Sequence, residues 1–230
     1  MAGRLYPAYQ KFYSALRNIE EFDKENNFFD NVSSLDNFFS EYRNITFVMQ
    51  KSLAHTEYMS LYDKYRTQFL KDHWFIDKRN EVIKEQPFRL IKQIDISIYF
   101  PSYGFTCDTK KFTVENDISI NTLINSIKEK FLETNLTEVF FSAKYFFYEE
   151  GKTENIIQKC IDGIKTMEDF MSTMYNEVGE KCSLCEELKN KISNYNFINT
   201  PMDFILIDDY VFYPNKNEFN RAQGFVKKSV

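Results

Sequence analysis

The chain has 230 residues, of which 43% are hydrophobic, and a formal net charge of −5, so its composition is that of a folded protein and not of a disordered one. The negative charge excludes a strongly basic nucleic-acid-binding surface over the whole molecule but is compatible with a local basic patch. The 24 Phe and 15 Tyr against 6 Gly and 5 Pro favour long packed elements with few flexible linkers.

The first third of the chain is predicted to be helical, because its large apolar residues recur at intervals of three and four. Three such stripes run from Tyr9 to Ile19, from Leu35 to Leu53 and from Tyr58 to Phe69. Ser33 and Ser34 are the expected N-cap residues of the second helix, since serine oxygens accept hydrogen bonds from the free N–H groups of a first turn.

A fourth helix is predicted over residues 71–85. It should end before Pro87, because a proline disfavours helical backbone in the residue that precedes it. Several long helices with short connections favour an antiparallel bundle. Residues 1–90 are therefore expected to form one helical domain, with a boundary near residues 87–92 that contains no flexible linker.

After this boundary the apolar period changes to that of a strand. Apolar residues alternate from Ile94 to Phe100, as in a strand that is buried on one face. A turn at Pro101–Gly104 would return the chain along residues 105–114 as a partner strand.

Residues 91–230 are expected to form an α+β region of unknown function. Helices are predicted at residues 121–133, 153–175 and 180–192, and strands at 139–148 and 204–212. The polar tail from Asn215 is expected to fray. The predicted fold class is α+β, with an N-terminal antiparallel helical bundle followed by a small antiparallel sheet with packed helices.

The segment with the most chemical information lies at the end of the fourth predicted helix. Four residues separate Arg79 from Lys84, and Asn80 follows the arginine directly. Further residues come earlier in the chain in a matching order: Arg43, Thr46, Phe47, Gln50 and Trp74. This pattern, over roughly residues 5–90, resembles the HEPN domains (higher eukaryotes and prokaryotes nucleotide-binding fold). Their signature is an Arg followed after four to six residues by a His, and Lys84 takes the place of that His.

The resemblance implies RNA chemistry at a shared interface. In active HEPN ribonucleases the Arg and His of two protomers meet, and RNA is cut without a metal, with its 2′-hydroxyl as the attacking group. An imidazole with an unperturbed pKa near ~6.5 can accept and return a proton at neutral pH, whereas a lysine with a reference pKa near ~10.4 stays a cation. Lys84 therefore keeps a contact for phosphate but removes the usual proton carrier.

Arg79 and Lys84 lie about 140° apart on an ideal helix, at ~100° per residue, so a joint site needs a second element or a second protomer. Arg43 on the second predicted helix could join Arg79 in an anion site. In the structural alternative, Arg79 and Lys84 form ion pairs with Asp77, Glu81 or neighbouring helices, and Arg43 forms a salt bridge or lies at the surface.

Three function classes follow. The first is a non-catalytic HEPN-like homodimer that binds RNA, a nucleotide or a protein partner through a cationic site at Arg43, Arg79, Asn80 and Lys84, without a cofactor. The second is a metal-independent endoribonuclease of a toxin or phage-defence type, with Arg79 stabilising the phosphate and Lys84 or a histidine replacing the proton carrier. The third is a structural or regulatory assembly protein.

Cys182 and Cys185 form a CxxC motif within a predicted helix. A structural zinc site needs four ligands, usually two such pairs, and Cys107 and Cys160 are distant and lack pair spacing. A thioredoxin-like role goes with a βαβ context, which the pattern does not predict. The pair is the chain's candidate for a metal or redox site, and the alternative is two thiols that share one helix face.

The sequence also bears on location. No apolar run approaches the ~18 residues that a membrane helix needs, and residues 1–7 lack the apolar core of a signal peptide. We therefore expect a cytoplasmic protein without a membrane partner, in which the cysteines are reduced thiols.

Overall fold

The structure, a computed structural model, describes residues 3–100, 106–114, 118–195 and 207–222. Within these ranges it contains seven α-helices and one five-stranded antiparallel sheet, which confirms the predicted α+β class. Contacts divide the chain into two compact parts, and each is described by itself. The helical unit is drawn from residues 1–89 and 156–201, and the sheet unit from residues 90–155 and 202–230.

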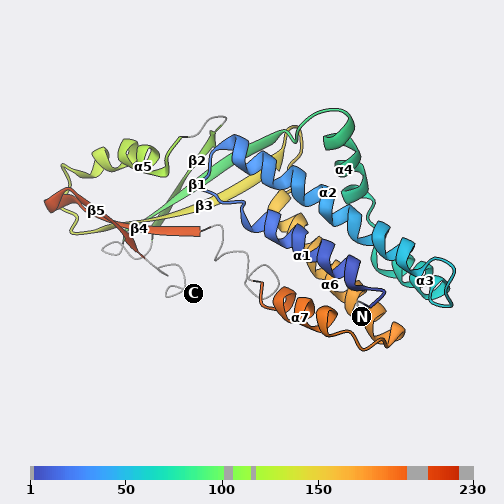
Figure 1. The fold of residues 1–230 in the computed structure, drawn as a ribbon. Helices are drawn as coiled ribbons and strands as arrows, with labels where there is room; N and C mark the ends of the chain where they lie inside the picture. Colours follow the sequence, from blue (N-terminus) through green and yellow to red (C-terminus); the bar gives the residue numbers. More distant parts are fainter. Residues whose placement is uncertain (1–2, 101–105, 115–117, 196–206, 223–230) are drawn as a thin grey trace. The chain divides into compact units, whose positions relative to one another are not determined.

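The described part of the helical unit contains six helices, and the four that were predicted before Pro87 are all present. The six are α1 Tyr6–Glu20, α2 Phe28–Leu53, α3 Met59–Phe69, α4 Trp74–Lys84, α6 Ile156–Val178 and α7 Ser183–Ser193. Figure 1 shows α1 and α2 side by side, joined by a short connection. None of the described helices is long and apolar enough to cross a membrane.

The sequence-based division at residue 90 assigned α6 and α7 to the second part of the chain, whereas their contacts lie in the helical unit. The hydroxyl of Tyr42 on α2 donates a hydrogen bond to the carbonyl oxygen of Gly163 on α6 at 2.9 Å. The ring of Tyr62 on α3 lies against Phe170 on α6, with centroids 6.1 Å apart. The first of these contacts joins positions 121 apart, which local periodicity does not record.

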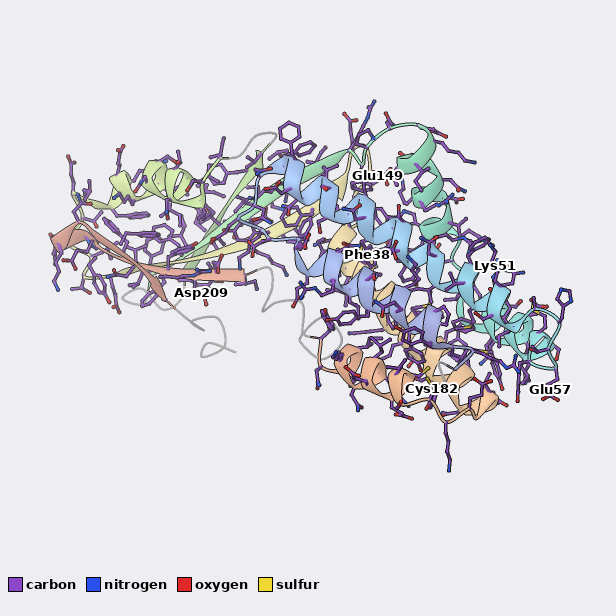
Figure 2. The ribbon with its side chains drawn as sticks, in the orientation of Figure 1. Phe38, Lys51, Glu57, Glu149, Cys182 and Asp209 are labelled. Carbon is purple, nitrogen blue, oxygen red and sulfur yellow. The ribbon has the colours of Figure 1, made fainter. Side chains whose placement is uncertain are left out.

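An aromatic cluster joins α2 to α4. Phe75 stacks on Tyr42 with ring centroids 4.3 Å apart, and Trp74 lies edge-on to Phe39 at 5.3 Å. Phe38, labelled in Figure 2, is fully buried, and its ring contacts both Tyr42 and Phe75. This cluster fixes the position of α4 on α2.

α2 begins earlier than the sequence suggested. Its N-cap is Asn27, whose side-chain oxygen accepts a hydrogen bond from the Asp30 N–H at 2.9 Å. The prediction of Ser33 or Ser34 as N-cap was therefore wrong. Asn caps a helix as well as Ser does, and Asp30 in the first turn adds a favourable charge at the positive end of the helix.

We expect Asn27→Ala to lower the free energy of unfolding by about 1 kcal/mol, because it removes this cap. Ser33→Ala is the matched control: Ser33 is exposed inside α2, so the change should stay within about 0.5 kcal/mol. Urea unfolding followed by the fluorescence of Trp74, the chain's single tryptophan, measures both. Equal decreases in the two variants would contradict the assigned cap.

The sheet unit is a single antiparallel sheet with strand order β2-β1-β3-β4-β5. Its strands are β1 Leu90–Phe100, β2 Thr106–Val114, β3 Val139–Glu149, β4 Ile207–Tyr213 and β5 Glu218–Ala222. α5 (Ile120–Lys128) carries a buried apolar side, and the short 3-10 helix η2 (Glu129–Phe131) follows it. Phe131 lies against Phe100 and Phe141, with centroids 5.5 and 6.2 Å apart. One face of the sheet is covered in this way.

Within the tail that was expected to fray from Asn215, residues 218–222 continue the sheet instead. The short 3-10 helix η3 (Pro214–Lys216) and Asn217, in the left-handed conformation at φ 52°, turn the chain. β5 then pairs with β4, and Arg221 forms an ion pair with the buried Asp208. The prediction failed because polar residues on an edge strand look like a loop in sequence. The predicted turn at 101–104 and the strand start at 204–206 lie outside the described residues.

Candidate anion site in the helical unit

Three arginines come from three helices of the helical unit, and the charges of two of them act on the third. Arg43 belongs to α2, Arg66 to α3 and Arg79 to α4. Burial lowers the pKa of Arg43; the Arg66 guanidinium lowers it further, Tyr62 raises it, and Arg79 lowers it again. Charges act on a pKa in this way when they lie nearby. We call these three residues the arginine cluster.

Aromatic residues one helical turn earlier position two of the three arginines. The hydroxyl of Tyr62 donates a hydrogen bond to the Thr46 carbonyl oxygen at 3.0 Å, which ties α3 to α2. Arg66 follows Tyr62 by four residues and so lies on the same face of α3. Phe75 ties α4 to α2 through its stacking on Tyr42, and Arg79 follows Phe75 by four residues.

The pKa of Tyr62 is also affected by two arginines of the cluster. Burial raises the pKa of the Tyr62 hydroxyl, whereas the charges of Arg66 and Arg43 lower it. Both guanidinium groups therefore act on this one hydroxyl, which lies beside α2 at the Thr46 carbonyl.

No carboxylate within the described residues neutralises the arginine cluster: none lies within 4.0 Å of a charged nitrogen of Arg43, Arg66 or Arg79. Arg43 donates a hydrogen bond to the Thr46 hydroxyl, and Arg79 Nη1 donates to Asn80 Oδ1 at 3.2 Å. The Nε of Arg79 is buried and has no hydrogen-bond acceptor there. A buried donor without an acceptor costs about 1–3 kcal/mol, so an anion that supplied one would be favoured.

The other residues of the predicted motif lie differently. Asn80 accepts the Arg79 hydrogen bond, and Lys84 is exposed in the last turn of α4. Glu81 pairs with the buried Lys78, with Nζ and Oε2 2.6 Å apart. In the described part of the chain, neither Arg79 nor Lys84 forms an ion pair with Asp77, with Glu81 or with a neighbouring helix, as the structural alternative expected.

Neither histidine is held in place as a proton carrier. His55 is exposed after the end of α2 with a left-handed backbone at φ 64°, and His73 is the exposed N-cap residue of α4. Neither side chain makes a hydrogen bond within the described ranges. A general base in RNA cleavage is normally oriented by such a partner.

An exposed aromatic ring follows Arg43 by one turn of α2. Phe47 leaves 46% of its surface exposed, and the Lys51 ammonium lies 4.5 Å from its ring centroid. Figure 2 labels Lys51 on α2. Residues four apart lie on the same helix face, so Arg43, Phe47 and Lys51 form a row of cation, ring and cation.

The sequence did not single out Arg66 or Tyr62. A signal was present, because the spacing of an aromatic residue and an arginine four positions later occurs at Tyr62–Arg66 and again at Phe75–Arg79. That spacing becomes meaningful only once both helices are known to pack on α2.

The two cysteines of the CxxC motif lie at the start of α7, apart from the residues of the arginine cluster in sequence. Cys182 is the N-cap residue and Cys185 lies in the first turn. No group of three or more His, Cys, Asp or Glu residues suited to a metal is found among the residues that the structure describes.

Comparison of the chain with protein-family models, with curated proteins and with solved structures finds no match. The HEPN resemblance therefore stays a prediction that rests on the residues quoted for it.

Proposed function

We propose that this protein is a non-catalytic, HEPN-like cytoplasmic protein that binds the phosphates of RNA or of a nucleotide at the arginine cluster. The observation that carries the proposal is a set of three arginines that no described carboxylate neutralises, in which one buried guanidinium N–H lacks an acceptor. Guanidinium groups bind phosphate with two parallel hydrogen bonds, which suits them to this ligand.

The row on α2 favours a nucleic acid over a bare phosphate. An exposed ring such as Phe47 can stack on an unpaired base, which contributes about 1–3 kcal/mol for each base in single-strand-binding proteins. Arg43 lies one turn before Phe47 and Lys51 one turn after it. A ligand that offers a base between two phosphates matches this order.

Binding without cleavage is favoured because, among the described residues, both histidine side chains are exposed and neither makes a hydrogen bond that would orient the imidazole. The endoribonuclease class and the assembly-protein class are the alternatives that the experiments below distinguish from binding. The homodimer that the resemblance implies is checked by light scattering on the same samples.

The test is fluorescence anisotropy with labelled single-stranded RNA of mixed sequence. We expect Arg43→Gln/Arg79→Gln to weaken binding by at least about tenfold, because the variant removes two charged hydrogen-bonding groups, each worth about 1.5–3 kcal/mol. The salt dependence of the affinity should also become shallower by roughly 0.7 for each phosphate that the variant no longer neutralises.

Lys165→Gln/Lys181→Gln is the matched control. It removes the same charge from exposed positions outside the cluster, and its affinity should stay within about twofold of wild type at ~0.15 M salt because exposed charges are screened. Equal weakening in the two double variants would contradict a defined site.

A parallel gel assay in EDTA tests the endoribonuclease alternative. RNA cleavage that disappears in the arginine variant would show metal-independent ribonuclease activity in place of binding alone. If the wild-type protein neither binds nor cleaves RNA, RNA is rejected as its ligand.

A further inference from the structure

Cys182 and Cys185 bring two thiols together at the N-terminus of α7. Both are buried, with 3% and 1% of their surfaces exposed. Figure 2 labels Cys182 at the beginning of this helix. The Cys182 sulfur accepts a hydrogen bond from the Cys185 backbone N–H at 3.3 Å, so the two cysteines are held on one turn of the helix. This arrangement lies within the helical unit and does not involve the arginine cluster.

The Cys182 sulfur is surrounded by hydrogen-bond donors. It accepts the backbone N–H of Gly3 at 3.1 Å and that of Cys185 at 3.3 Å. Burial raises the pKa of Cys182, but the Cys185 thiol and the N–H groups of Gly3, Cys185 and Leu184 outweigh burial, so that the net pKa lies below its ordinary value. Donors at a helix N-terminus stabilise a thiolate in this way.

Cys185 has the opposite character. Burial, the hydrogen bond to Cys182 and the charge of Cys182 together raise its pKa to about 12. At neutral pH the pair is therefore asymmetric, with Cys182 the better nucleophile and Cys185 a protonated thiol. A change that removes the charge of Cys182 also removes two of the causes that hold the pKa of Cys185 high.

A short strap of the N-terminal segment covers the Cys182 sulfur. Gly3 lies so close that a Cβ atom there would be 2.8 Å from the Cys182 Cβ. The Arg4 N–H donates to Glu180 Oε2 at 2.7 Å, and Arg4 Nε lies 2.7 Å from Glu180 Oε1. Leu5, Tyr175, Val178 and Glu180 lie around both cysteines.

We propose that Cys182 and Cys185 form a redox-active dithiol, which a low-molecular-weight disulfide oxidises to an intramolecular disulfide once the strap at Gly3 and Arg4 opens. The Cys182 thiolate attacks one sulfur of the reagent, whose sulfur–sulfur bond breaks, and one thiolate leaves. Cys185 then gives up its proton and attacks the Cys182 sulfur of the mixed disulfide, releasing the second thiolate. The protein loses two electrons and two protons, and the reagent becomes two thiols.

The spacing suits this step, because two cysteines separated by two residues at a helix start are a common arrangement of exchanging thiols. A metal site is less well supported, since no group of three or more residues suited to a metal is found among the described residues. The two backbone N–H groups that Cys182 accepts, from Gly3 and Cys185, favour its thiolate form.

The first experiment incubates the full chain in glutathione buffers from fully reduced to fully oxidised and maps the cysteine peptides by mass spectrometry. We expect a reversible disulfide between Cys182 and Cys185. Cys185→Ser should trap one glutathione on Cys182, whereas Cys182→Ser should leave Cys185 unmodified. Cys160, buried in α6 with a raised pKa, is the internal control and should stay a thiol. A pair that stays reduced in fully oxidised glutathione, or equal adducts at both positions, would overturn the proposal.

A second experiment tests the strap. Arg4→Gln removes the ion pair with Glu180 and should speed alkylation of Cys182 by iodoacetamide by up to about fivefold, the effect of one partly exposed ion pair. Arg17→Gln, which removes a surface arginine paired with Glu20, is the control and should leave the rate unchanged. Equal rates in both variants would overturn the claim that the strap limits access to Cys182.

Half-maximal alkylation of Cys182 should also occur at a lower pH than that of free cysteine. A higher pH would overturn the assignment of Cys182 as the nucleophile.

Discussion

Replacing Phe75 by Ala should lower the free energy of unfolding of the helical unit by about 3–5 kcal/mol, the usual cost of removing a buried ring. Phe75 is 7% exposed and stacks on Tyr42 at 4.3 Å between ring centroids. Its ring also contacts Phe38 and Trp74, and it fills the space above Gly163. The void left behind borders rigid rings that cannot close over it.

Urea unfolding followed by Trp74 fluorescence measures this decrease in the helical unit. Phe29→Ala is the matched control, because Phe29 leaves 78% of its surface exposed and its removal should cost no more than about 0.5 kcal/mol. Phe75→Ala should also weaken RNA binding, since Phe75 sets the position of Arg79 one turn later. A Phe75→Ala protein as stable as Phe29→Ala would contradict the packing of α4 on α2.

Gly163→Ala should destabilise the helical unit by about 1–3 kcal/mol, although alanine is the better helix former by about 1 kcal/mol. A Cβ atom at this position would lie 2.1 Å from Phe75 Cζ, far inside the contact distance of two carbons. The ring cannot move aside freely, because Tyr42, Phe38 and Trp74 surround it.

The decisive measurement is a double-mutant cycle with Phe75→Ala. In the Phe75→Ala background the obstacle is gone, so Gly163→Ala should become neutral or stabilising by up to about 1 kcal/mol through helix propensity. The sign of its effect would thus reverse between the two backgrounds. The same destabilisation in both would mean that the close approach of α4 to α6 does not limit position 163.

Both predictions concern the packing that also positions the arginine cluster. Like charges brought together cost stability, and partly buried guanidinium groups without acidic partners add to that cost unless a ligand compensates them. The aromatic contacts of Tyr62 and Phe75 offset this cost and hold Arg66 and Arg79 beside Arg43. Stability and the proposed binding therefore depend on the same rings.

Local spacing predicted the helices before Pro87 and the paired strands that follow, because a helix or a half-buried strand is recorded in apolar intervals of three to four or of two. Local spacing was less informative at polar positions. Asn27, and not Ser33 or Ser34, is the N-cap of α2. The residues of β5 were predicted to be a frayed tail, because an edge strand needs few apolar residues.

The sequence by itself determined the α+β class, the candidate residues Arg43 and Arg79, and the CxxC pair. The tertiary structure alone decided that α6 and α7 belong with the first four helices, that Arg66 completes the arginine cluster, and that Gly3 covers Cys182. The physical reason is the range of the contacts. Periodicity records neighbours within a few residues, whereas Tyr42 meets Gly163 across 121 positions and Gly3 meets Cys182 across 179. Such pairs are selected by the packing of the whole unit.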